Sequence, residues 1–112
     1  MSYTATQVAN WIIDKANNTD SGDNITNLKL QKLLYYFQGY YLAVFDKPLF
    51  DEEIEAWQYG PVVPQVYYKF NSFGKGNLEV TTEGVAPFTD EEKELLNEVF
   101  DVYNDFSAVG LM

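Results

Sequence analysis

The chain has 112 residues, of which 46% are hydrophobic and 17% aromatic, and this supplies one core without metal or disulfide support. It has no cysteine and no histidine, which excludes disulfides, thiolate nucleophiles, zinc sites with nitrogen or sulfur ligands and histidine acid–base catalysis. Seventeen acids against seven basic residues give a formal net charge of −10. We therefore expect residues 1–112 to form a single domain with no cofactor and no metal.

The negative charge is concentrated towards the end of the chain, where residues 79–112 hold nine acids and one lysine. Binding to a phosphate backbone needs clustered positive charge, so direct nucleic-acid binding is not expected. An acidic surface can serve solubility alone. It can also attract a basic protein, or a protein whose nucleic-acid site it imitates.

No membrane partner is expected either. The N-terminal MSYTATQV lacks the basic lead and apolar run of a secretory signal, and no window is long and apolar enough to cross a bilayer. The sequence therefore predicts a cytoplasmic protein.

The first predicted helix begins at Thr4, which forms a capping-box pattern with Gln7. Trp11 is expected at the margin of its buried face, which comprises Ala5, Val8, Ala9, Ile12, Ile13 and Ala16. Residues 17–23 end this helix. They lack the ligand alternation and closing glutamate of a calcium loop, so we interpret them as an ordinary loop.

A central helix is predicted over residues 26–41, with Thr26 as its cap. One stripe of this helix is apolar and is expected to carry the core: Leu30, Leu33, Leu34, Phe37 and Tyr41. Lys29, Lys32 and Tyr36 follow one another at three- and four-residue steps, which places two cations and a phenol on another strip of the same helix.

A turn over residues 46–50 is expected to lead into a strand over residues 54–59, which Gly60-Pro61 would close. Alternation puts Ile54 and Ala56 on one face of this strand, and it puts Glu55, Trp57 and Tyr59 on the other. The second face can be a specific contact surface, or it can cover a small core. The sequence leaves both interpretations open.

Pro64 suits the first turn of a third helix, which would end at Gly74 and whose apolar side would comprise Val63, Val66, Tyr67 and Phe70. Residues 78–83 alternate weakly, and we expect them to pair with residues 54–59 as a two-stranded antiparallel ribbon over the helices.

A fourth helix of about four turns is predicted after Thr89, which forms a second capping box with Glu92. Its expected buried side comprises Leu95, Leu96, Val99, Phe100, Val102, Tyr103 and Phe106. The predicted fold class is α+β, mainly α, with about four helices and a small two-stranded antiparallel β element.

Three stretches together resemble the Panacea domain, the SocA-like antitoxin family often found in phage-associated proteins. They are TNLKLQKLLYYFQGYYLA, then KPLF followed by IEAWQYGPVVPQVYYKF, and the later DFSA. The signature falls on residues 28–36 and on Ala56, Trp57, Tyr59, Gly60, Pro61 and Val62. The resemblance implies neutralisation of a cognate toxin protein by direct binding. In the SocA type it also implies delivery of that toxin to a cytosolic ATP-dependent protease.

The chain departs from the family pattern at its end. Family members continue past the Ser107-Ala108 step into a further helix and Thr-His and Pro-Trp segments, whereas this sequence ends at Met112 without a histidine. We therefore expect a Panacea domain shortened at its C-terminus relative to the family.

The hypothesis with the sharpest consequences is a toxin-binding surface with Tyr36, Trp57 and Tyr59 as aromatic anchors. The candidate partner-binding residues are Lys29, Lys32, Tyr36, Glu55, Trp57, Tyr59, Gly60 and Pro61. The lysines can pair with acids on the partner, or they can hold the strand to the helix through Glu55.

Two other classes of function compete with toxin binding. An enzyme would have to use Glu55, Tyr36, Tyr59 and the lysines without a visible nucleophile–base pair, so we do not expect an enzyme. An acidic phage-encoded protein could instead imitate nucleic acid or inhibit a host protein through its terminal helix, and such binding would collapse as salt rises.

Overall fold

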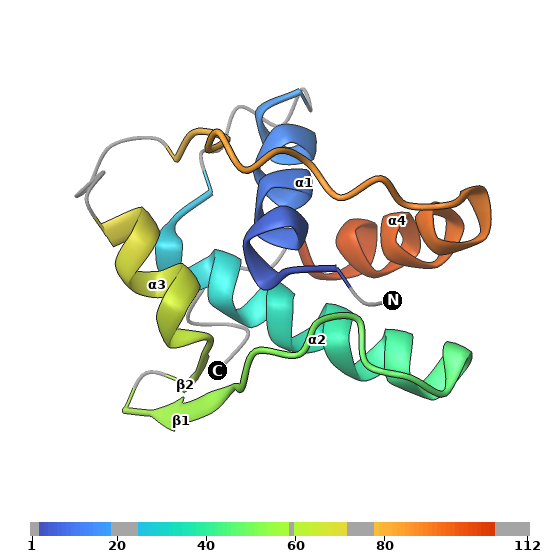
Figure 1. Cartoon of the computed structure of the whole chain (residues 1–112), viewed down its shortest axis with the longest axis horizontal. Helices are drawn as coiled ribbons and strands as arrows, with labels where there is room; N and C mark the ends of the chain where they lie inside the picture. The colour runs from blue at the N-terminus through green and yellow to red at the C-terminus, as the bar shows by residue number, and fades with distance from the viewer. Residues whose placement is uncertain (1–2, 19–24, 59, 72–77, 105–112) are drawn as a thin grey trace.

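The computed structural model describes residues 3–18, 25–58, 60–71 and 78–104 (Figure 1). The elements are the helices α1 (Ala5–Asn17), α2 (Asn27–Phe45), α3 (Pro64–Asn71) and α4 (Asp90–Asn104), and the strands β1 (Glu55–Trp57) and β2 (Gly60–Val62). Helix α2 contacts the other three helices and β2, so it is the centre of the packing. The predicted α+β, mainly α fold class is confirmed. No helix within the described ranges is both long enough and apolar enough to cross a membrane.

Helix α1 begins as predicted. Thr4 Oγ1 accepts the Gln7 N–H at 3.1 Å, while the Thr4 N–H donates to Gln7 Oε1 at 3.1 Å. The predicted inward face is fully buried, and Trp11 is half-buried against the rings of Phe37 and Phe88. Local capping and periodicity were therefore sufficient to place this helix.

Helix α2 is a single uninterrupted helix capped by Thr26, whose Oγ1 accepts the Lys29 N–H at 3.1 Å. All five residues of its predicted apolar stripe are buried. The helix continues four residues beyond the predicted end, to Phe45. Asp46 then adopts a left-handed conformation with φ of 59°, and its N–H donates to the Leu42 carbonyl. This C-cap reverses the chain, so the following residues run back along α2 (Figure 1).

The β element is an antiparallel hairpin in which β1 pairs with β2, with Glu55 opposite Val62 and Trp57 opposite Gly60. The predicted pairing of residues 54–59 with residues 78–83 is wrong, and Gly60-Pro61 lies within β2 instead of forming the closing turn. Gly60 has a φ of 121°, a conformation that glycine adopts readily. The chain can therefore return directly beside β1.

Residues 78–83 are held by α1, and this explains why they do not form a strand with β1. The Thr81 N–H donates to Asn10 Oδ1 at 3.0 Å, and Asn10 Nδ2 donates to the Gly84 carbonyl at 2.8 Å. Further along the chain, the Ala86 N–H donates to the Gln7 carbonyl. Thr81, and Gly84 and Ala86 just beyond the segment, are thus hydrogen-bonded to α1.

Helix α3 starts at Pro64 as predicted, and its predicted end at Gly74 lies outside the described residues. Helix α4 has the predicted capping box, because Thr89 and Glu92 exchange hydrogen bonds between backbone N–H and side-chain oxygen. The prediction that Val102 is buried is wrong, since it is 57% exposed. Helix α4 packs mainly on α2, so its buried strip is narrow. Phe106 lies outside the described residues.

Glu92 also has a role in the core that the sequence analysis did not assign. Its side chain is buried, and its carboxylate accepts the Tyr3 hydroxyl at 2.6 Å and the Tyr41 hydroxyl. Burial alone would raise the pKa of Glu92, but hydrogen bonds from Thr89, Tyr3 and Tyr41 outweigh it, so the pKa is lowered. One carboxylate therefore ties the N-terminal residues, α2 and α4 together.

Candidate functional site

A groove runs along the outer face of α2. It consists of two adjoining cavities of about 390 and about 550 Å³. The first is lined by Tyr35, Tyr36, Gln38, Gly39, Tyr40, Ala43 and Ile54, and the second by Tyr35, Tyr36, Ile54, Glu55, Ala56, Trp57, Gly60 and Pro61. Because three lining residues are shared, we treat both cavities as one surface, the α2 groove.

Because Gly39 has no side chain, it leaves the backbone of α2 uncovered in the first cavity. Apart from Gly39 itself, its chain neighbours and the backbone of its own helix, no heavy atom lies within 4 Å of the position that a Cβ on Gly39 would occupy. A glycine inside a helix costs about 0.5–1 kcal/mol relative to alanine, so this position is not optimised for helix stability. A partner can approach the backbone of α2 closely here.

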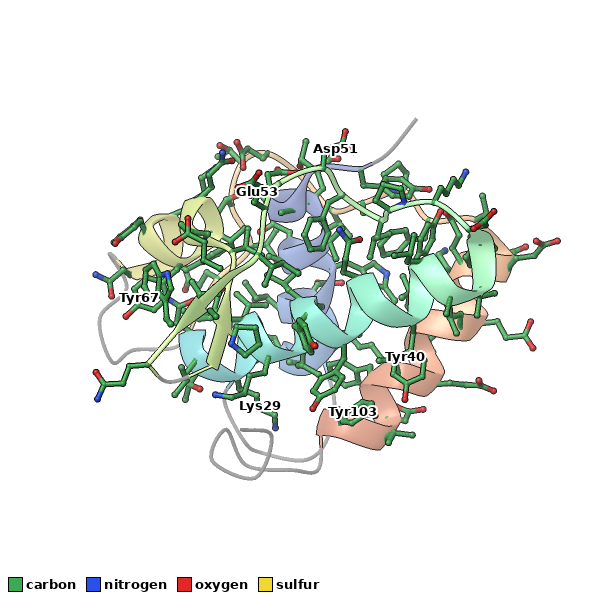
Figure 2. All side chains as sticks on the ribbon, turned by 90° about the horizontal axis from the view of Figure 1, so that it is seen from below. Lys29, Tyr40, Asp51, Glu53, Tyr67 and Tyr103 are labelled. Carbon is green, nitrogen blue, oxygen red and sulfur yellow. The ribbon has the colours of Figure 1, made fainter. Side chains whose placement is uncertain are left out.

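One side of the groove is built from tyrosines that join α2 to α4. The ring of Tyr36 stacks on that of Tyr103, with centroids 4.1 Å apart and planes 7° apart. The hydroxyls of Tyr40 and Tyr103 lie 2.9 Å apart, and Figure 2 shows these two side chains close together below α2. The hydrogen bond with Tyr40, together with burial, raises the pKa of Tyr103. This side of the groove is therefore braced by contacts within the fold.

The other side is the extended segment leading to β1, which Gln38 of α2 holds in place, while Gln31 of α2 holds the residue that follows β2. Gln38 Oε1 accepts the Leu49 N–H at 2.7 Å, and Gln38 Nε2 donates to the Phe50 carbonyl at 2.8 Å. Two turns earlier, the buried Gln31 Oε1 accepts the Val63 N–H at 2.9 Å. The groove is thus shaped by hydrogen bonds to backbone groups. In the sequence, the sign of this role was the seven-residue spacing of Gln31 and Gln38 beside the apolar stripe of α2.

Trp57 closes the hairpin end of the groove. Its indole Nε1 donates to Glu55 Oε1 at 3.0 Å, which holds that carboxylate beside the ring. The ring centroid lies 5.2 Å from that of Tyr67 and 5.8 Å from that of Tyr68, both on α3. Trp57 is half-buried, so it packs on α3 and also presents surface to the groove.

Lys32 is fully buried and lies directly under the hairpin. A Cβ added to Gly60 would lie 3.2 Å from Lys32 Cε and 3.3 Å from Lys32 Nζ. Burial lowers the pKa of Lys32, because the charged ammonium is disfavoured away from water. The strip expected from Lys29, Lys32 and Tyr36 is therefore not an exposed one, since Lys29 and Tyr36 are both half-buried.

The structure brings five of the eight candidate residues together in the α2 groove: Tyr36, Glu55, Trp57, Gly60 and Pro61. Lys32 lies beneath Gly60, Lys29 lies near the start of α2 (Figure 2), and Tyr59 lies outside the described residues. Six residues that line the first cavity were not among the candidates: Tyr35, Gln38, Gly39, Tyr40, Ala43 and Ile54. Tyr35 and Tyr40 could have been found from the sequence, because they are large aromatic residues outside the apolar stripe of the helix.

The position of Lys32 leads to a prediction about packing. We expect Lys32→Met to be more stable than Lys32→Ala, because methionine keeps an unbranched apolar stem of similar length between α2 and the hairpin. Lys32→Ala should be less stable by about 2 kcal/mol relative to Lys32→Met, because it leaves a cavity. Urea unfolding of both variants checks this. Equal stability of the two variants would contradict a packing role.

The chemistry of the groove suits the binding of polypeptide side chains. Its lining is mainly aromatic and aliphatic, with Glu55 at one end. Among the residues that the structure describes, no group of three or more acids is placed to hold a metal ion. Grooves with rigid aromatic walls concentrate binding energy when a partner excludes water from them.

Comparison with known proteins adds two findings. Residues 30–112 match the family described as "Antitoxin SocA-like, Panacea domain". A curated relative, "Antitoxin SocA" of Caulobacter vibrioides (strain NA1000 / CB15N), is 45% identical over 73 residues, which make up 65% of this chain and 38% of the relative. The match thus spans well under half of that relative's length. No solved structure matches the chain. The resemblance seen in the sequence motifs is confirmed.

Proposed function

Since this chain belongs to the SocA-like Panacea domain family of antitoxins, we propose that it neutralises a cognate toxin protein by binding it directly, with the α2 groove as the docking surface. The observation that carries the proposal is the groove itself. Tyr35 and Tyr40 are 48% and 42% exposed at its edge, although removing a tyrosine ring from water is favourable. Contact with a partner would remove this aromatic surface from water.

The construction of the groove supports tight binding. Tyr36 is fixed by its stack on Tyr103, and the opposite side is fixed by the hydrogen bonds of Gln38 to Leu49 and Phe50. Side chains that are already ordered lose less conformational entropy when a partner binds. The groove therefore needs little rearrangement to accept a partner.

The proposed role is not enzymatic. The carboxylate in the groove, that of Glu55, accepts a hydrogen bond from Trp57 Nε1 and lies beside aromatic rings. Nucleophilic catalysis would need a nucleophile and a base within hydrogen-bond reach of each other. Binding alone accounts for the residues that line the groove.

The likeness to SocA-type antitoxins implies a second step, in which the chain delivers the bound toxin to a cytosolic ATP-dependent protease. Sequestration and delivery differ in what happens to the toxin. Delivery lowers the toxin level in cells that contain the protease, whereas sequestration leaves the level unchanged. Toxin level in the co-expressing cells, measured alongside growth, therefore separates delivery from sequestration.

Gly39→Trp is the variant that tests the docking surface. An indole at this position enters the open space of the groove, and replacing a helical glycine does not weaken α2. We expect wild-type protein to restore growth when it is co-expressed with the toxic product of a neighbouring gene. Gly39→Trp should fail to protect and should bind that product at least about tenfold more weakly, a loss of about 1.4 kcal/mol.

The matched control is Lys93→Trp, which places the same side chain on an exposed position of α4 outside the groove lining. It should protect as well as wild-type protein. Circular dichroism and thermal melting establish that both variants are folded. Equal protection by folded Gly39→Trp would remove the groove from the mechanism.

The alternative, imitation of nucleic acid or inhibition of a host protein, is favoured by the five exposed acids of α4: Asp90, Glu91, Glu94, Glu98 and Asp101. The same co-expressed product can decide between the two surfaces. Binding through these exposed acids falls steeply as salt rises, because exposed charges are screened. Binding through aromatic rings in the α2 groove changes little with salt.

A further inference from the structure

The α2 groove has an acidic border on one side. Glu55 lines the groove and also a neighbouring hollow of about 350 Å³. That hollow is lined by Asp51, Glu52, Glu53, Glu55, Pro64 and Gln65. Figure 2 shows Asp51 and Glu53 on the segment that runs along α2, on the side away from Tyr40 and Tyr103. The aromatic surface therefore continues directly into a negatively charged one.

Three of these acids face outward together. Residues 51–55 alternate in exposure, so Asp51, Glu53 and Glu55 are exposed while Glu52 and Ile54 are half-buried. This is the alternation expected of an extended chain. We name the three outward carboxylates the acidic row.

Glu52 serves the fold instead. Its Oε2 accepts the Ala5 N–H at 2.9 Å, at the N-terminus of α1, where a negative charge also complements the helix dipole. The inward acid therefore has a structural role, while the acidic row is exposed along the border of the groove and reaches the groove lining at Glu55.

Trp57 gives this border a further property. Its indole holds Glu55 in place through the 3.0 Å hydrogen bond, so a carboxylate and an aromatic ring lie side by side at the edge of the groove. A guanidinium or ammonium group is attracted both by the face of an aromatic ring and by a carboxylate. Such a pair favours a cation over a neutral or acidic side chain.

We infer that the polypeptide segment that occupies the α2 groove is basic as well as apolar, with apolar or aromatic side chains over Gly39 and lysine or arginine side chains against the acidic row. The inference rests on the proposed function and specifies the partner chemistry of that same site. Opposite charges across the border increase the association rate, and an acidic segment is rejected because like charges would be brought together.

A random dodecapeptide library displayed on phage tests the inference without knowledge of the toxin. The library is selected on the full chain and depleted on Gly39→Trp, so that only peptides that need an open groove are enriched. We expect the enriched peptides to carry lysine or arginine next to leucine or aromatic residues. Synthetic copies of these peptides are then titrated against variants by fluorescence anisotropy.

Two charge-reversal pairs separate local contact from overall charge. Glu53→Lys with Glu55→Lys should weaken peptide binding at least about tenfold. Glu91→Lys with Glu94→Lys changes the net charge equally but lies on α4 outside the groove lining, and it should weaken binding less than about threefold.

Enriched peptides that are acidic or uncharged would overturn the inference and leave the groove as a docking surface. Equal weakening by both pairs would also overturn it, because overall charge would then explain the effect. If no peptide distinguishes wild-type protein from Gly39→Trp, the groove is not a peptide site and the inference is overturned as well. Antitoxin activity is measured separately, by protection from the toxin.

Discussion

Glu92→Leu is expected to lower the free energy of unfolding by about 3 kcal/mol at neutral pH, because it removes a buried acceptor from two phenols and one backbone N–H. Tyr3 and Tyr41 would keep their hydroxyls inside the protein without this carboxylate. The Thr89 N–H, which donates to Glu92 Oε1 at 2.8 Å, would lose its acceptor, and the capping box would be broken. For a domain of this size such a loss is a large share of the total stability.

Urea unfolding measures this loss, with Glu91→Leu as the matched control. Glu91 is the preceding residue of the same first helical turn, but it is exposed, so its replacement should change stability by no more than about 0.5 kcal/mol. Equal effects of the two leucines would show that the buried network contributes nothing beyond helix preference.

The pH dependence of stability provides a second readout of the same network. The pKa of Glu92 is lowered in the folded protein from the ordinary value of 4.5, so the unfolded chain binds its proton more readily. The stabilisation is therefore present above pH 4.5 and is lost as pH falls below it towards the folded pKa. Glu92→Leu should lack this acid-side loss.

On the alkaline side the sign is opposite. Burial and the hydrogen bond to Glu92 raise the pKa of Tyr3 from 10.0 to about 12, so stability is present below pH 10.0 and is lost as pH rises towards 12. The pKa of Tyr41 is raised for the same reasons. Unfolding curves measured from acid to alkaline pH should therefore show a stable plateau between the two limits in wild-type protein.

Gly60→Ala is expected to destabilise the protein by about 2 kcal/mol, for two independent reasons. The φ of 121° at Gly60 is rarely adopted by residues with a side chain. The added methyl would also lie 3.2 Å from Lys32 Cε, which is tighter than ordinary contact. In a domain of this size the midpoint of thermal unfolding should fall by roughly 10 °C.

Gly39→Ala is the matched control, because it is the same chemical change at a helical position with open space around it. It should stabilise the protein by about 0.5–1 kcal/mol. Opposite shifts of the two melting temperatures would support the geometry of both glycines. Shifts of the same sign would contradict the account given of Gly60.

The candidate site was only partly accessible from the sequence. The aromatic and turn residues of the hairpin could be singled out, because Trp57, Gly60 and Pro61 are unusual residue types close together in the chain. Their contact with Tyr36 depends on how residues 46–54 return along α2, and that path is set by Gln38 through backbone hydrogen bonds. A pattern of residue types contains no direct signal of that path.

The sequence by itself determined where the helices begin and which stripe of α2 is buried, because the interactions that define these features span only three or four residues. Thr4, Thr26 and Thr89 cap their helices through the third residue after each, and the apolar stripe of α2 follows the helical repeat. These local rules give the same answer in any tertiary setting that buries the stripe.

Only the tertiary structure decided which strand pairs with β1, that Lys32 is buried and that Glu92 serves the core. Each depends on contacts between distant parts of the chain: Glu92 meets Tyr3 across 89 positions, and Asn10 holds Thr81 across 71. Whether a polar side chain is exposed or buried depends on whether such distant partners satisfy its hydrogen bonds. Those partners come together only when the helices pack.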